Sequence, residues 1–155
     1  MSTTLDAAIQ RAAGTIHAHR DAVCLALITE TVDRQRTSLK RKAKGLYREA
    51  AEARAFAERL HDLDTRLTFH LGNVADIVRA AWDDILTAVV CREATELVNG
   101  QKARRKFAES GDGPARRVAT LQFEAAEETA RELSQVKEAL TAIRDASRSA
   151  DLVAA

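Results

Sequence analysis

Residues 39–73 read LKRKAKGLYREAAEARAFAERLHDLDTRLTFHLGN. This stretch decides the fold, because its leucines and alanines recur at steps of three and four residues, the spacing of one helix face. It closes on Gly72 and Asn73, a pair that suits the end of one helix and the N-cap of the next. The sequence therefore predicts a helix over 38–71 that ends at Gly72.

The same periodicity recurs on both sides of this stretch. It predicts further helices over 4–34, 74–99 and 115–149. The polar run 33–38 contains neither glycine nor proline, and we interpret it as the link between the first two helices. Residues 110–114 read SGDGP, the clearest loop in the chain, with a proline that suits the first turn of the last helix.

Four amphipathic helices joined by short links predict an all-α fold, an up-down-up-down four-helix bundle. The alternative is an extended antiparallel coiled-coil hairpin, in which one long helix continues through Gly72. A length of 155 residues fits one domain, which we take to span 1–155. One proline and 4% aromatic residues argue against a disordered or an all-β chain.

Charge and targeting signals exclude several classes of protein. The chain has 24 Lys+Arg and 23 Asp+Glu, so it is neither strongly basic nor strongly acidic. We expect no secretory signal and no membrane span. Cys24 and Cys91 form no CxxC pair, and we expect two reduced core thiols. The alanine- and arginine-rich composition suggests a bacterial cytoplasmic protein.

The sequence contains little that indicates catalysis. Glu58 and His61 form one Glu-x-x-His motif, but a di-metal bundle needs a second such motif and two more glutamates. No nucleophile elbow and no phosphate-binding glycine loop occurs. We therefore expect no enzyme, no metal and no cofactor. A histidine phosphotransfer module using His70 is a minor alternative.

Two apolar runs, 22–28 and 85–91, are apolar on nearly every side, so one buried stripe cannot cover them. The residues off the main stripes are Leu25, Ile28, Val32, Leu86 and Val90. A second apolar face calls for a partner, either a second copy of the chain or a helix of another protein. The alternative is that these helices lie centrally in an irregular bundle. The favoured function is a non-enzymatic helical interaction protein: an adaptor, a chaperone or an assembly component.

In the four-helix arrangement two basic clusters would meet at one end of the bundle. Their members are Arg36, Lys40, Arg41, Lys42 and Lys44 near the first link, and Lys102, Arg104, Arg105, Lys106, Arg116 and Arg117 near the third. The alternative function is accordingly a protein that binds a polyanion, nucleic acid or acidic lipid, at this end. The plainer interpretation is a solvated helix end with charged loops.

Overall fold

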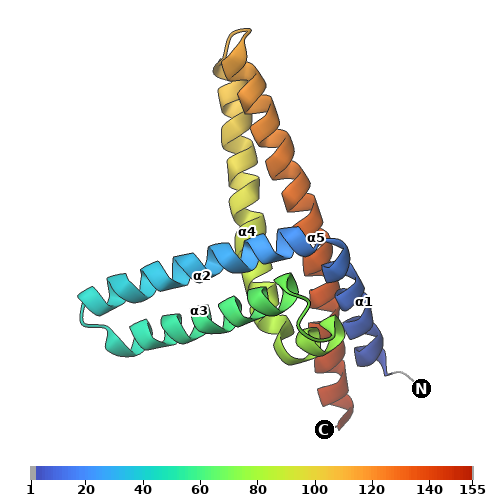
Figure 1. The fold of residues 1–155 in the computed structure, drawn as a ribbon. Coiled ribbons are helices and arrows are strands. Elements are labelled where there is room, and N and C mark those ends of the chain that lie inside the picture. The colour runs from blue at the N-terminus through green and yellow to red at the C-terminus, as the bar shows by residue number, and fades with distance from the viewer. Residues whose placement is uncertain (1–2, 155) are drawn as a thin grey trace.

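The computed structural model describes residues 3–154, so the extreme ends of the predicted 1–155 domain lie outside the described residues. The fold is all-α, as predicted, but the helical bundle has five helices rather than four among these residues (Figure 1). Their bounds are α1 Thr4–Ala18, α2 Arg20–Ala43, α3 Tyr47–Thr68, α4 Val74–Glu109 and α5 Pro114–Ala154. The prediction of an up-down-up-down four-helix bundle is therefore wrong.

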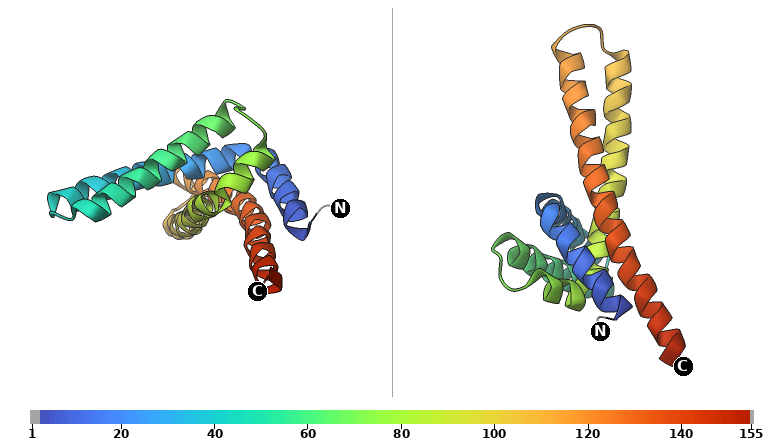
Figure 2. Two further views of the ribbon diagram at one scale, coloured as in Figure 1. Left: turned by 90° about the horizontal axis from the view of Figure 1, so that it is seen from below. Right: turned by 90° about the vertical axis from the view of Figure 1, so that its right-hand side faces the viewer.

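The helices form two antiparallel hairpins that cross. Helices α2 and α3 pair along one arm, and α4 and α5 pair along another that runs in a clearly different direction (Figures 1 and 2). Helix α1 lies beside the C-terminal part of α5 and also contacts α4. Helices α3 and α5 do not touch. Each arm therefore extends beyond a shared junction and ends in a free tip.

The core lies where the two hairpins cross. All five helices contribute side chains that are less than 2% exposed: Ile16, Val23, Leu27, Leu60, Leu67, Ile77, Val78, Ile85, Val89, Leu133, Leu140 and Ile143. Burial of one such aliphatic side chain stabilises a fold by about 1.5–3 kcal/mol. Toward the arm tips the buried residues are mostly alanines, such as Ala50 on α3 and Ala119 on α5. The large apolar side chains therefore anchor the crossing point, and the tips contribute little.

The first predicted helix, 4–34, breaks much earlier than the polar run 33–38. The chain turns at His19, which has φ −116° and ψ 35°. His19 Nε2 lies 2.9 Å from Oε1 of Gln135 on α5. The turn sends α1 along α5 while α2 turns away to pair with α3. Because neither a glycine nor a proline lies at this turn, we attribute the break to tertiary contacts.

The polar run 33–38 is helical, so the predicted link there is wrong. These residues are polar because they lie on the arm beyond the core, where α2 has solvent on most sides. Helix α2 ends instead at Ala43, and Gly45, two residues later, has φ 76°. The Gly45 and Leu46 N–H groups donate to the carbonyls of Lys42 and Arg41, both at 3.0 Å. This is a Schellman motif, whose positive φ glycine accommodates without strain.

The end of α3 agrees with the prediction in outline. Helix α3 stops at Thr68, and Asn73 caps α4 by accepting a hydrogen bond from the Ala75 N–H at 2.8 Å. The alternative of one helix through Gly72 is therefore wrong. The left-handed C-terminal position belongs to His70, with φ 55°, and Leu71 N donates to Arg66 O at 2.9 Å. The sequence predicts Gly72 for this helix-ending position, and that part of the prediction is wrong.

The helices predicted over 74–99 and 115–149 both continue further toward the C-terminus than expected. Helix α4 passes through Asn99 and Gly100 to Glu109, ten residues beyond the expected end. Gly100 is buried against Ala126 and Glu127 of α5, and this packing keeps the helix intact across a residue of low helix propensity. The loop at 110–114 is found where predicted, and α5 begins on Pro114 and continues to Ala154.

Candidate interaction surface

A row of exposed aliphatic side chains follows the solvent side of α2. Leu25, Ile28 and Val32 are 42%, 47% and 38% exposed, and Leu39, one heptad beyond Val32, is 69% exposed. The spacing of three, four and seven residues places all four on one line along a helix. Gln35 occupies the remaining position on that line and is also exposed. We call these five residues the outer row.

The outer row exists because α2 buries its opposite side. The buried residues of this helix are Ala22, Val23, Ala26, Leu27, Glu30 and Thr31. Leu25 and Leu27 show the division: Leu27 is 0% exposed and lies about 200° around the helix from Leu25. The interpretation of Leu25, Ile28 and Val32 as central core residues is therefore wrong, because each is substantially exposed in the single chain.

Leu86 and Val90 do not join this surface. Leu86 is half-buried and packs against the core, whereas Val90 is 43% exposed. Arg92 on α4 contacts α2, since its Nη1 donates to Oγ1 of Thr29 at 3.3 Å. Val90 lies about 200° around α4 from Arg92 and so points away from α2. The five residues predicted for self-association thus fall on two separate surfaces.

Sequence reasoning missed Leu39 and Gln35 as members of the outer row. The misplaced link at 33–38 assigned Leu39 to the inner stripe of the next helix. The heptad spacing from Leu25 to Leu39 was the signal that could have found them, because it is unbroken across the supposed link.

A groove adjoins the outer row on the α3 side of the arm. It has a volume of about 590 Å³ and is open to solvent. Gln35, Ser38, Leu39 and Lys42 line it from α2, and Tyr47, Ala50, Ala51, Arg54, Ala57 and Glu58 line it from α3. Its alanines leave room for close approach, since no large side chain fills the space between the two helices. The outer row and the groove share Gln35 and Leu39.

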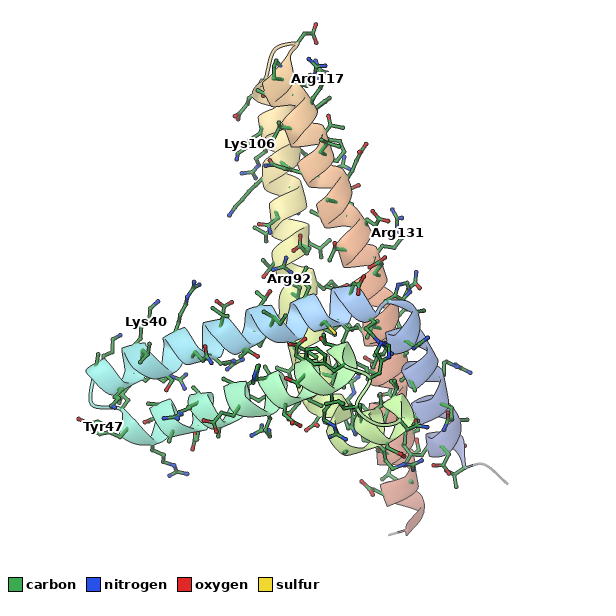
Figure 3. The ribbon with its side chains drawn as sticks, in the orientation of Figure 1. Lys40, Tyr47, Arg92, Lys106, Arg117 and Arg131 are labelled. Carbon is green, nitrogen blue, oxygen red and sulfur yellow. The ribbon has the colours of Figure 1, made fainter. Side chains whose placement is uncertain are left out.

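The basic clusters do not meet as predicted. Lys40 and Tyr47 lie at the tip of the α2–α3 arm, and Lys106 and Arg117 lie at the tip of the other (Figure 3). The expected single basic end required four parallel or antiparallel helices around one axis, whereas the two hairpins diverge from their crossing point (Figure 1). The eleven predicted residues therefore form two patches.

The two patches also differ in how their charges are balanced. At the α4–α5 tip Arg104 pairs with Glu127, and Arg116 pairs with Asp112 and lies over the ring of Phe107. At the α2–α3 tip Lys40, Lys42 and Lys44 are exposed and make no ion pair among the described residues. The guanidinium of Arg41 donates to the backbone carbonyl of Glu49 at 3.2 Å. Arg36 pairs with Asp33, and among the described residues Lys102, Arg105, Lys106 and Arg117 make no ion pair either, so both tips keep free basic charge.

The histidines and cysteines lie in different surroundings. The Arg20 guanidinium lies between His70 and His17, with Nη2 3.0 Å from Nδ1 of His17. Both thiols, Cys24 and Cys91, are half-buried and unpaired, and burial raises the pKa of each above the usual value of a thiol. Nowhere in 3–154 do three or more metal-ligating side chains cluster. Glu58 instead pairs with Arg54.

Comparisons with family models, with curated proteins and with solved structures find no match for this chain. Within the described residues, none of the helices has the combination of length and apolar character that a membrane span requires.

Proposed function

We propose that this chain is a non-enzymatic helical interaction protein, an adaptor, chaperone or assembly component, which binds an α-helix along the outer row of α2. The observation that carries the proposal is the exposed line of Leu25, Ile28, Val32 and Leu39. The line spans about 21 Å at 1.5 Å per residue, enough for several turns of a docked helix. Isolated exposed leucines are ordinary, but four exposed aliphatic side chains on one line of a helix favour an interface.

The spacing of the outer row favours a helical partner over an extended peptide. Side chains at positions a and d of successive heptads insert between the side chains of a facing helix. An extended strand repeats every two residues and matches no such line. No sheet edge exists in residues 3–154 to accept a strand. A helix laid along α2 is therefore the occupant that this surface fits best.

The direct test is photo-crosslinking in cells that produce the chain. A photo-reactive phenylalanine replaces Ile28 in one variant and Glu52 in a matched control, because Glu52 is exposed on a different side of the same arm. We expect a crosslinked adduct from position 28 and none from position 52. No adduct at position 28, or equal adducts from both positions, would refute the proposal.

A second candidate function is polyanion binding at the α2–α3 tip. Three exposed lysines favour this function: Lys40, Lys42 and Lys44. They make no ion pair among the described residues and are therefore available for phosphate contacts. Replacement of the three by alanine should abolish binding of a fluorescent oligonucleotide or of anionic vesicles at low salt. Replacement of Lys102, Arg104 and Arg105 at the other tip is the matched control and should have a smaller effect. No binding by the wild-type chain would remove this function.

A further inference from the structure

We propose that the helix bound along the outer row is α2 of a second copy of this chain, packed in the antiparallel direction. The inference rests on the proposed function and names its partner. It is carried by the distribution of charge along α2, by the spacing of the outer row and by the groove beside it.

The two ends of α2 carry opposite free charges on the outer side of the helix. Asp21 lies one turn before Leu25 on the same line and is exposed, with no ion pair in the described part of the chain. Lys42, three heptads after Asp21, is exposed and equally unpaired. Between them Asp33 and Arg36 pair with each other at 3.6 Å and cancel. The outer side of α2 is therefore acidic at its beginning and basic at its end.

This asymmetry decides the direction in which two copies pack. A parallel pair would place Lys40, Lys42 and Lys44 against their own copies, and like charges held together oppose association. An antiparallel pair places these lysines on the side of Asp21 of the other α2, whose carboxylate supplies the opposite charge. That pairing unites opposite charges at both ends of the interface. Because the two copies are related by a two-fold axis, each favourable contact occurs twice.

The spacing of the outer row fits one antiparallel alignment. With the two-fold axis between Asp33 and Arg34, Ile28 of one copy lies level with Leu39 of the other. Leu25 then lies level with the aliphatic stem of Lys42, whose ammonium group extends toward Asp21 one turn away. Val32 lies level with Gln35, the single polar member of the row. A polar residue inside an apolar seam favours one register over others.

The groove lets the second α2 pack more closely than the outer row alone would allow. Leu39 belongs both to the outer row and to the groove wall, and Tyr47, Ala50 and Ala51 continue that wall on α3. The alanines let the second α2 approach closely, so that it contacts α3 as well as α2. Two arms packed in this way bury the exposed aliphatic side chains of the outer row.

The first measurement is the mass of the purified full-length chain by light scattering at micromolar concentrations. We expect twice the 17.0 kDa of one chain. A mass of one chain up to millimolar concentration would overturn the inference. The proposed function then stands or falls separately, since a photo-adduct from position 28 that contains a different protein supports it, and no adduct refutes it.

The second measurement decides the direction of packing. In a background with Cys24→Ala and Cys91→Ala, Leu25→Cys and Lys42→Cys are made as separate chains and oxidised alone and mixed. The antiparallel pair predicts a disulfide-linked dimer only in the mixture. Disulfides within each variant alone, with none specific to the mixture, indicate parallel packing and overturn the inference, as does an oxidised mixture that stays monomeric. Circular dichroism of each variant checks that the helices are retained.

Charge reversal gives an independent readout in which no cysteine is needed. Asp21→Lys and Lys42→Asp should each raise the dissociation constant of the dimer by roughly tenfold, because each places like charges at both ends of the interface. The two changes combined in one chain should restore most of the affinity. Equal, additive losses without restoration would contradict the contact between Asp21 and Lys42. The same reversals at Asp112 and Arg117, on the other arm, serve as the control and should leave the dimer unchanged.

Discussion

The two arms of this molecule share one architecture but differ in the contacts between their helices. Both are antiparallel helix pairs that leave the crossing point, and both use alanines where their helices touch. In the α4–α5 arm ion pairs cross between the helices, such as Lys137 with Glu93, and near the tip the rings of Phe107 and Phe123 meet edge to face at 5.8 Å. No ion pair joins α2 to α3 within residues 3–154.

This difference shows how each arm is held together. In the α4–α5 arm Arg104 and Arg116 form ion pairs and aromatic contacts close the tip, although this arm also has exposed apolar side chains such as Leu97 and Leu121. The α2–α3 arm turns its aliphatic row outward, leaves its lysines unpaired and has a groove between its helices. In the proposed pair, a second α2 covers this row and groove. Substitutions on the two arms should therefore have different consequences.

The largest expected effect is at the crossing point on which both arms depend. Leu27→Ala removes a side chain that is fully buried and leaves a cavity, which should lower the free energy of unfolding by about 2–5 kcal/mol. Leu25→Ala is the matched control, the same change two residues away on the outer row, and should cost under about 1 kcal/mol. Urea unfolding measures both. Similar costs would show that the inner and outer sides of α2 are wrongly assigned.

The next effect compares the two tips. Phe107→Ala removes the edge-to-face contact with Phe123 and the contact with the Arg116 guanidinium, and should cost roughly 1–3 kcal/mol. Tyr47→Ala at the other tip removes an exposed ring that makes no ring contact among the described residues, and should cost under about 0.5 kcal/mol. Hydrogen exchange of the amides near each substitution locates the loss. Equal loosening of both tips would abolish the contrast.

Two glycines give effects of opposite sign. Gly45→Ala forces a Cβ into a backbone with φ 76° and should destabilise the chain by roughly 1–2 kcal/mol. Gly100→Ala lies within α4, where the new Cβ would meet Ala126 at an ordinary 3.8 Å, and should stabilise it by roughly 0.5–1 kcal/mol. Thermal unfolding shows the two signs directly. A destabilising Gly100→Ala would mean that α4 and α5 lie closer together than described.

Periodicity and capping signals were sufficient for part of this fold. They found the start of α1, where Thr3 Oγ1 accepts a hydrogen bond from the Asp6 N–H, the cap at Asn73 and the loop before Pro114. These signals are local, so the sequence carries them. The break at His19 depends on α5, more than a hundred residues away. No residue near His19 in the sequence indicates this break.

The residues of the candidate interaction surface were also predictable only in part. Leu25, Ile28 and Val32 were identified because they repeat off the main stripe, a pattern that needs no knowledge of the fold. Val90 shows the same pattern, yet a helical wheel cannot say that α4 turns it away from α2. The convergence of the basic clusters failed for a related reason, because it assumed that all helices share one axis. Relative placement of helices lies outside what periodicity encodes.

The smallest expected effect concerns the thiols. Because burial raises the pKa of Cys24 and Cys91, alkylation by iodoacetamide near pH 8 should be several-fold slower than for a free cysteine. The rate should rise as the pH increases past the usual thiol range, where the thiolate begins to form. Cys24 flanks the outer row, so Leu25→Ala with Ile28→Ala, which adds no negative charge beside the thiolate, should speed its alkylation and leave that of Cys91 unchanged. Equal changes at both thiols would point to general loosening.

The most direct test of the central claim compares the wild-type chain with the double variant Leu25→Glu, Ile28→Glu. Both side chains are exposed in the single chain, so we predict wild-type helicity by circular dichroism and a cooperative unfolding transition whose temperature, unlike that of the dimeric wild type, does not depend on chain concentration. By light scattering, we predict two chains for the wild type and one for the variant. Unfolding of the variant would show that these residues are core, because a buried unpaired charge costs several kcal/mol. A folded variant that keeps a mass of two chains would show that the outer row is not the interface.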